Sequence, residues 1–259
     1  MERIVRLETV QNLRELGGLP AADGRRVAFG RLFRSGSLHE ASPTDRAELE
    51  AMGVRITIDL RSAFEQARQS YEWPSGRRVA APLAHDEAVA AIFARFQAGG
   101  LTEQDVEDWW HLTGVFRLPE EHAASMRTIF TTLLEAGPAE GVLFHCTGGK
   151  DRTGVVAAFL LEALGAPRQV ILEDFLLTNV GAAARAAEFV EWMKRATGQS
   201  MRPEIGYWLA GVKDEWLETL LDQTTARYGS IAGYLRDRLG FGASEVAALR
   251  AGYLEPPGA

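Results

Sequence analysis

Residues 141–164 constrain the fold of this chain more than any other segment. They begin with a short apolar run at 141–146 and end with a helix-length stretch at 153–164 that is apolar on nearly every side. A helix of that kind is buried over most of its surface. Because a glycine-containing stretch joins the two parts, we predict a strand, a loop and a buried helix in direct succession.

The chain around this segment alternates between strand-like and helix-like runs. Stretches rich in Val, Ile and Phe at 27–33 and 54–60, and a weaker one at 78–83, predict further strands. Helical patterns with start or stop signals fall at 43–52, 120–136 and 167–179. Strands separated by helices predict an α/β fold in which helices cover both faces of a central parallel sheet.

The last third of the chain has a helical pattern only. Residues after 180 offer Trp192, Trp208, Trp216 and Leu220 as packing residues and no further strand. No linker rich in Ser, Gly and Pro divides the chain, and no repeat is apparent. We therefore predict a single domain over residues 1–259, with a helical C-terminal elaboration.

The charge and the cysteine content narrow the class of protein. A net charge of −7 argues against a general nucleic-acid-binding protein, although a local cluster of amides and arginine can still bind a small anion. The single cysteine excludes an intrachain disulfide. The sequence shows no signal-peptide core and no run of ~20 apolar residues. We expect no stable membrane insertion and a cytoplasmic location; export by a signal-free route would leave no mark.

The loop at 145–154, with the sequence HCTGGKDRTG, carries the candidate chemistry. The start of a helix offers unpaired amides and partial positive charge, which together favour phosphate binding. Gly148 and Gly149 allow the backbone to curl so that successive amides converge. Arg152 lies where the loop closes and can grip two phosphate oxygens at once.

Cys146 is the candidate nucleophile of this loop. A helix N-terminus beside an arginine favours the reactive thiolate, and His145 and the Thr153 hydroxyl are suited to hold the loop and donate to the sulfur. A lone cysteine is more often a small buried hydrophobe, but the surrounding Gly-Gly-Lys-Asp-Arg-Thr-Gly run favours catalysis. Substrate would be bound by the rest of the loop: Thr147, Gly148, Gly149, Lys150, Thr153 and Gly154.

These residues resemble a known family. Cys-x5-Arg followed by Thr is the signature loop of the protein tyrosine phosphatase superfamily. The form HCxxGKDRTG is similar to the bacterial tyrosine and phosphoinositide phosphatases that include mycobacterial protein tyrosine phosphatase B. The similarity extends over most of the chain and is weakest at 86–119. The other matching segments are NLRELGG at 12–18, GRLFRSGSLHE at 30–40, IDLRS at 58–62 with Glu65 downstream, DFLLTN at 174–179 and YGSIAGYLRDRLG at 228–240.

The resemblance implies a tyrosine phosphatase-like fold and a two-step reaction. The Cys146 thiolate would attack phosphorus and leave a phosphocysteine, which water then hydrolyses, while the loop amides and Arg152 stabilise the equatorial oxygens. No cofactor or metal is implied. The substrate would be a protein phosphorylated on tyrosine, with phosphoserine, phosphothreonine and phosphoinositides as further candidates. A helical lid after residue 180 is implied by the resemblance alone.

The leaving group needs a proton donor, and two aspartates are candidates. The eukaryotic-type enzymes carry the acid in a Trp-Pro-Asp loop, but this chain has Trp-Pro-Ser at 73–75, and serine cannot serve as a general acid. Asp151 lies inside the phosphate loop, where a role as an anchor explains it equally well. Asp86 follows a predicted strand end, where ligands often bind, yet a helix cap explains it better. We name Asp151 first.

Charged residues near predicted strand ends are candidate supporting residues. Asp59 and Arg61 end one predicted strand, and Glu65 follows one helical turn later. The simpler interpretation is an Arg61–Glu65 ion pair that braces the sheet edge, and the functional one places Arg61 in the active-site wall. We expect structural support close to the site. The same alternatives apply to Arg34 at the end of another strand.

Two further features bear on the substrate. Lys150 adds a second positive charge to the loop, which suits a substrate with more than one phosphate; a solvent-facing lysine is the alternative. The weakly similar region holds an aromatic cluster, which is either core or the lining of a substrate cleft. Its members are Trp109, Trp110, His111 and Phe116.

Two other functions use a related loop. A rhodanese-like sulfurtransferase also has a loop cysteine, but such loops are commonly shorter and lack the Gly-Lys-Asp-Arg-Thr run. A phosphate-binding pseudophosphatase would typically have lost the cysteine or the arginine, and both Cys146 and Arg152 are present. The sequence therefore favours a cysteine-dependent phosphatase.

Overall fold

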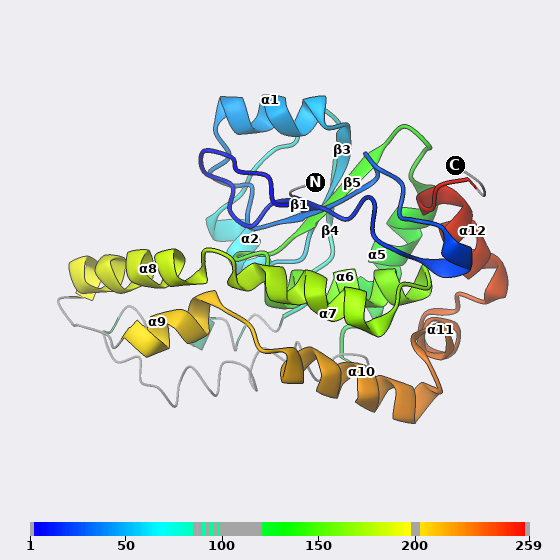
Figure 1. Ribbon diagram of the computed structural model, residues 1–259. Helices are drawn as coiled ribbons and strands as arrows, with labels where there is room; N and C mark the ends of the chain where they lie inside the picture. Colours follow the sequence, from blue (N-terminus) through cyan, green and yellow to red (C-terminus); the bar gives the residue numbers. More distant parts are fainter. Residues whose placement is uncertain are drawn as a thin grey trace.

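A five-stranded sheet with the strand order β1-β2-β5-β3-β4 forms the centre of the computed structural model (Figure 1). Strands β2, β5, β3 and β4 are parallel, and β1 runs antiparallel to β2 at the edge. The structure describes residues 3–84, six residues between 87 and 98, residues 121–197 and residues 203–256. The strands are β1 Arg14–Glu15, β2 Leu32–Ser35, β3 Val54–Asp59, β4 Arg77–Ala80 and β5 Gly141–His145.

Helices surround this sheet and then continue to the C-terminus. Those between the strands or directly after the last strand are α1 Pro43–Ala51, α2 Ala63–Arg68, α5 Ala123–Glu135, α6 Asp151–Ala163 and α7 Arg168–Leu176. The later ones are α8 Ala182–Thr197, α9 Pro203–Ala210, α10 Asp214–Tyr228, α11 Ile231–Tyr234 and α12 Ala243–Tyr253. Shorter turns are η1 Ala22–Gly24, η3 Leu177–Asn179 and η4 Leu235–Leu239.

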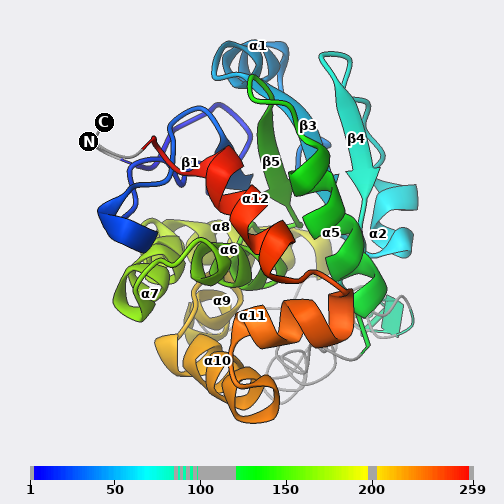
Figure 2. The ribbon, with the colours of Figure 1, turned by 90° about the vertical axis from the view of Figure 1, so that its right-hand side faces the viewer.

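The alternation of side chains along the strands assigns each face of the sheet to a different set of helices. One face packs against α5, α6, α7 and the C-terminal helices in the main core, and α12 lies beside α5 and α6 there (Figure 2). The other face is covered by α1 and the N-terminal segment in a smaller cluster. Phe144 belongs to the first face and Leu143 to the second.

Most predicted elements are confirmed. The run at 54–60 forms β3, the run at 141–146 forms β5, and the helices predicted at 43–52 and 153–164 are α1 and α6. Ser42 caps α1 with Pro43 at its first position. Helix α6 is buried along almost its whole length, as its apolar composition predicts.

The bounds of one predicted strand are wrong, and one strand was not predicted. The strand expected at 27–33 is confined to Leu32–Ser35, because Gly30 has φ +73° and turns the chain before it. Val27 forms only an isolated bridge to Leu254. Strand β1 was not predicted, since its two residues, Arg14 and Glu15, carry no strand signal. The sheet is therefore mostly parallel rather than wholly so.

No helix in the parts of the chain that the structure describes is both long enough and apolar enough to cross a bilayer.

The C-terminal helices are fixed to α6 by an aromatic contact. Phe159 is fully buried and meets Tyr234 edge to face, with ring centroids 5.3 Å apart. Tyr234 in turn contacts Tyr228 of α10. The helical elaboration therefore packs on the helix that follows the loop at 145–154.

We predict that Phe159→Ala lowers the free energy of unfolding by about 3–5 kcal/mol, because it removes a fully buried ring and leaves a cavity. Urea unfolding monitored by circular dichroism measures this change. Phe29→Ala is the matched control, since Phe29 is 53% exposed, and its effect should stay below about 1 kcal/mol. Equal losses in the two variants would contradict the packing described above.

Candidate active site

The loop at 145–154 leaves the central strand β5 at its carboxyl end and enters α6. Cys146 is its second residue, and its side chain is almost fully buried. The neighbouring strands β2 and β3 end at the same edge, so the segments after Ser35 and Asp59 border the loop. This is the edge at which parallel sheets bind ligands.

Gly149 is required by the loop geometry. It has φ +66°, and a Cβ at this position would lie 2.4 Å from the carbonyl carbon of Ser35. A side chain would therefore be strained by the backbone conformation and would also clash with the end of β2. The glycine permits the curl that the sequence predicted for this loop.

Most carbonyl groups of the loop are bound from outside it, and that of Cys146 is bound by the His145 ring. The carbonyls of His145, Cys146 and Thr147 accept from Leu60 N, His145 Nδ1 and Ser37 N at 2.8, 3.2 and 2.9 Å. Those of the next three residues accept from Asn12 or Arg34. The amide nitrogens of Thr147, Gly148, Gly149, Asp151 and Arg152 donate to no atom of the described residues. An anion beside Cys146 can therefore be bound by this set of amides.

Arg152 is held in a fixed orientation by Glu65. The guanidinium donates from Nη1 to Oε2 at 2.6 Å and from Nη2 to Oε1 at 3.0 Å. The Thr147 hydroxyl also donates to Oε1. Glu65 itself caps the first turn of α2 by accepting from the Ser62 amide at 2.8 Å. Although burial opposes ionisation, Arg152 and these donors lower the pKa of Glu65 to about 2, so the pair stays charged.

The prediction of an Arg61–Glu65 ion pair is wrong. Arg61 pairs with Asp59, its Nη2 lying 2.7 Å from Oδ2 and its Nε 3.0 Å from Oδ1, and both side chains are fully buried. Glu65 turns toward the loop because the N-terminus of α2 faces Arg152. Burial opposes ionisation of Asp59, but Arg61, His145 and Arg78 lower its pKa to about 2. Asp59 and Arg61 brace the strand next to the loop, while Glu65 holds Arg152 directly.

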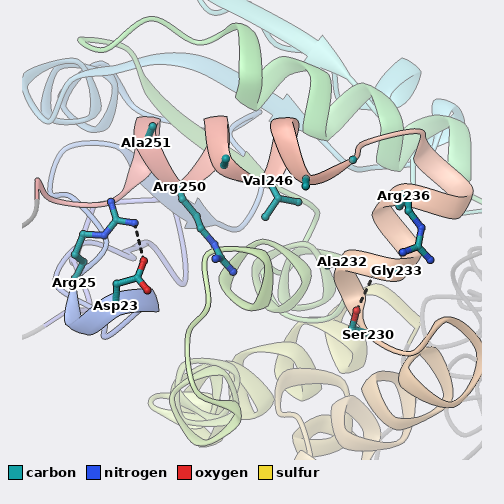
Figure 3. Close-up of a pocket in the computed structure, with 12 residues that line it drawn as sticks. Asp23, Arg25, Ser230, Ala232, Gly233, Arg236, Val246, Arg250 and Ala251 are labelled. Atoms are coloured by element: carbon teal, nitrogen blue, oxygen red, sulfur yellow. Dashed lines mark hydrogen bonds and ion pairs between the residues drawn. The ribbon is translucent and has the colours of Figure 1, made fainter.

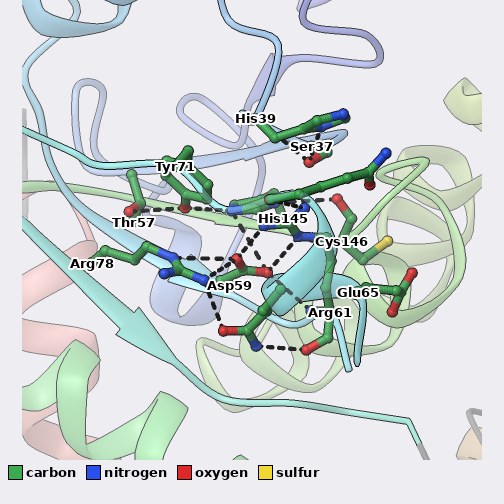
Figure 4. Close-up of polar contacts among 12 residues, drawn as sticks. Ser37, His39, Thr57, Asp59, Arg61, Glu65, Tyr71, Arg78, His145 and Cys146 are labelled. Carbon is green, nitrogen blue, oxygen red and sulfur yellow. Dashed lines mark hydrogen bonds and ion pairs between the residues drawn. The ribbon is translucent and has the colours of Figure 1, made fainter. Parts of the chain in front are cut away.

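His145 lies between Tyr71 and Cys146 (Figure 4). Its Nδ1 is 3.2 Å from the Cys146 carbonyl, and its Nε2 is 2.6 Å from the Tyr71 hydroxyl. Burial lowers the pKa of His145 to about 4, so the ring is neutral at pH 7. A neutral ring that donates from Nδ1 to the carbonyl accepts at Nε2 from Tyr71. No signal in the sequence pointed to Tyr71.

The sulfur contacts expected from His145 and Thr153 are not formed. The His145 donor goes to the carbonyl of Cys146, and Thr153 Oγ1 is buried without a hydrogen-bond partner among the described residues. Both residues nevertheless lie where the sequence placed them, at the two ends of the loop. Of the two, His145 supports the loop backbone through the Cys146 carbonyl.

Lys150 and Asp151 meet the segment that follows α9. Lys150 Nζ donates to the Gly211 carbonyl at 2.8 Å and lies 3.5 Å from Asp151 Oδ2. The alternative of a solvent-facing lysine is therefore wrong, and burial lowers the pKa of Lys150. Asp151 Oδ1 is buried and accepts no hydrogen bond from the described residues. Burial raises the pKa of Asp151, which favours its protonated form.

Some predicted residues cannot be placed. Asp86, the second candidate for the proton donor, lies outside the described residues, as does the aromatic cluster at 109–116. Helices α8 and α9 pack against each other (Figure 1), and Asn179 binds the linker after them through both the amide and the carbonyl of Val212. The linker, through Gly211, is the part of this C-terminal region that reaches the loop.

A groove of about 610 Å³ lies at the other end of α6 (Figure 3). Its arginines already have partners. Arg250 Nε donates to the carbonyl of Ala163, the last residue of α6, at 2.9 Å. Arg25 and Arg236 pair with Asp23 and Asp237. Since the phosphate loop precedes the first turn of α6, this groove is separate from the active site.

A buried cysteine, a set of amides that donate to no atom of the described residues, and a carboxylate-held arginine meet at the strand–helix junction, an arrangement suited to binding phosphate beside a thiol. The sequence comparisons identify the family. Residues 5–255 match the model described as the tyrosine phosphatase family. The chain belongs to this family, which confirms the resemblance seen in its motifs.

Two individual relatives and one solved structure are similar to this chain. The chain is 36% identical over 254 residues to a putative tyrosine-protein phosphatase of Cupriavidus necator, covering 95% of this chain and 87% of the relative. It is 32% identical over 237 residues to the triple specificity protein phosphatase PtpB of Mycobacterium tuberculosis, covering 80% and 85%. The solved structure of Pseudomonas aeruginosa TpbA with pTyr aligns with 76% of this chain and 89% of its own, at 16% identity and a TM-score of 0.36.

The neutral state of His145 makes the stability of the fold depend on pH. Its pKa of about 4 in the fold lies below the ordinary value of about 6.5. The unfolded chain therefore binds this proton more readily, so the contribution is fully present above about pH 6.5 and is lost as the pH falls toward 4. Between pH 7 and pH 5 we predict that the wild type loses about 2 kcal/mol more than His145→Gln.

Urea unfolding of both proteins at the two pH values tests this prediction. The carboxylates titrate in both proteins, so their contribution to the change in the free energy of unfolding cancels in the comparison. Equal losses in the wild type and in His145→Gln would show that the ring is not held neutral.

Proposed function

We propose that the chain hydrolyses phosphate monoesters through a phosphocysteine formed on Cys146. The observation that carries this proposal is the arrangement of the loop, where unpaired amides surround a buried cysteine and Glu65 fixes Arg152 at the edge. Phosphotyrosine is the principal substrate. Phosphoserine, phosphothreonine and phosphoinositides are further substrates of the same site, and the relative described as a triple specificity phosphatase supports this wider range.

The first step transfers the phosphoryl group to sulfur. The Cys146 thiolate attacks phosphorus in line, a P–S bond forms, and the bond from phosphorus to the ester oxygen breaks. The leaving oxygen takes a proton from Asp151. The amides and Arg152 stabilise the charge on the three equatorial oxygens, which is where catalysis of this reaction chiefly arises.

The second step regenerates the enzyme. Water attacks phosphorus and gives a proton to the Asp151 carboxylate, the P–S bond breaks, and inorganic phosphate and the thiolate remain. Asp151 suits both steps because burial raises its pKa and because Oδ1 is left without a donor from the described residues. Lys150, beside it, supplies a cation for a second phosphate group on the substrate.

We predict that Cys146→Ser lowers kcat on p-nitrophenyl phosphate by about 10⁴-fold or more, because a serine hydroxyl is not ionised at neutral pH. The variant should still bind inorganic phosphate, since the amides and Arg152 remain. Steady-state kinetics on p-nitrophenyl phosphate, phosphopeptides and a phosphoinositide panel also define the substrate range. Wild-type turnover by Cys146→Ser would contradict the mechanism.

The same assays distinguish the two alternative functions. Thiosulfate:cyanide sulfur transfer without phosphatase turnover would identify a rhodanese-like enzyme. Tight phosphopeptide binding by the wild type without turnover would identify a pseudophosphatase.

We predict that Asp151→Asn lowers kcat for alkyl phosphates by about 10²-fold or more, and kcat for p-nitrophenyl phosphate by about 10-fold or less. The reason is that only a poor leaving group needs the proton. The ratio of kcat values on the two substrates measures this difference. Asp86→Asn is the matched variant for the second candidate. If Asp151→Asn slows both substrates equally, Asp151 is an anchor for the loop and not its acid.

A further inference from the structure

A buried ion cluster lies behind the phosphate loop. Asp174 of α7 is 1% exposed, and its carboxylate accepts from Arg14 Nε at 3.2 Å and from Arg34 Nη1 at 2.6 Å, with Arg3 as a third partner. Arg14 and Arg34 are fully buried on β1 and β2. Although burial opposes ionisation, these arginines hold the pKa of Asp174 well below its usual range, so the carboxylate is charged.

Arg34 joins this cluster to the loop. While Nη1 binds Asp174, Nη2 donates to the Gly149 carbonyl at 3.0 Å and to the Lys150 carbonyl at 3.3 Å. The planar guanidinium makes these contacts from one rigid group. The Lys150 carbonyl also accepts from Gly154 N at 2.8 Å in the first turn of α6, so the position of Asp174 chiefly fixes the direction of the Gly149 carbonyl.

Asn12 makes the second connection. Its Oδ1 accepts from Arg14 Nη1 at 2.6 Å, which leaves Nδ2 to donate to the Gly149 carbonyl at 2.8 Å and to the Gly148 carbonyl at 3.2 Å. Asn12 has φ +57°, an uncommon conformation for a residue other than glycine. Arg14 thus sets the orientation of the Asn12 amide, and Asp174 in turn holds Arg14.

Because each peptide is planar, these carbonyl contacts also fix the direction of the amides that follow them. In a planar trans peptide the N–H points opposite to the preceding carbonyl. Asn12 and Arg34 hold the Gly148 and Gly149 carbonyls, and this directs the amides of Gly149 and Lys150 the other way. We propose that Asp174, Arg34 and Asn12 are positioning residues, which turn these two amides of the loop toward the phosphate by holding the carbonyls behind them.

Arg34→Lys tests this proposal against a matched control. Lysine keeps the positive charge beside Asp174 but cannot reach Asp174 and both carbonyls at once. Arg31→Lys is the control, because Arg31 is also buried, lies just before the same strand and also donates to a backbone carbonyl, that of Gly137 at 2.8 Å. That carbonyl is remote from the loop, at the end of α5.

The readout is the inhibition constant of inorganic phosphate together with kcat and KM on p-nitrophenyl phosphate. We expect Arg34→Lys to raise the phosphate Ki by about 10-fold and lower kcat/KM by about 10²-fold, with Arg31→Lys within about twofold of the wild type. Loss of folded protein lowers the apparent kcat but leaves Ki unchanged. An unchanged Ki in Arg34→Lys, or an equal rise in Arg31→Lys, would overturn the proposal.

Asn12→Gly is a second variant with less risk to folding, since glycine readily adopts φ +57° and the change removes the Nδ2 donor without adding a charge beside the phosphate. It should also raise the phosphate Ki by about 10-fold. Its control is Asp45→Asn, which loosens the same N-terminal segment by weakening the contacts of Asp45 with the amides of Glu8, Thr9 and Val10. If Asp45→Asn raises Ki as much, general loosening and not amide orientation is responsible.

This inference rests on the proposed function of the loop, and one measurement separates the two. Phosphate binding by calorimetry to Cys146→Ser, with and without Arg34→Lys, reports the loop geometry without any turnover. A wild type that fails to hydrolyse esters would contradict the proposed function alone. Equal phosphate affinity of Cys146→Ser with and without Arg34→Lys would contradict the positioning network alone.

Discussion

The hydrogen bonds that hold the loop carbonyls are the interaction on which the site depends. Apart from the Cys146 carbonyl, which the His145 ring binds, the carbonyls from His145 to Lys150 accept from groups of the surrounding fold. Because the peptide planes are rigid, the amides then point away from these contacts and are available to an anion. The outside donors come from three distant parts of the chain, so the site exists only in the folded protein.

The order of the strands brings these donors together. Strand β5 lies between β2 and β3, so the segments after those strands border the loop, and Ser37 and Leu60 donate from them. Helix α6 continues the loop and is buried against the sheet, which fixes the direction of the helix end. The packing of α7 on α6 then carries Asp174 to the back of the loop. In this fold the geometry of the site therefore depends directly on the packing of the core.

Local patterns predicted much of this arrangement, and long-range partners account for what they missed. The apolar run, the two glycines and the apolar helix predicted the strand, the loop and α6, because each depends on neighbouring residues. The Arg61–Glu65 pair failed because spacing along the chain does not reveal that Asp59 and Arg152 lie closer in the fold. Asp174 lies 140 residues from Arg34 in the sequence, and Asn12 lies 137 residues from Gly149. No spacing rule connects either residue to the loop.

The charges of the site show why an acidic chain can bind phosphate. Three arginines near the loop have an ionised carboxylate beside them: Arg152 has Glu65, and Arg14 and Arg34 share Asp174. Such partners reduce the net charge but hold the guanidinium groups in place without a reorganisation cost when the anion arrives. Because Asp174 serves more than one arginine, the cluster keeps an excess of positive charge behind the amides. The overall charge of −7 therefore says little about this site, whose affinity depends on oriented donors in a buried setting.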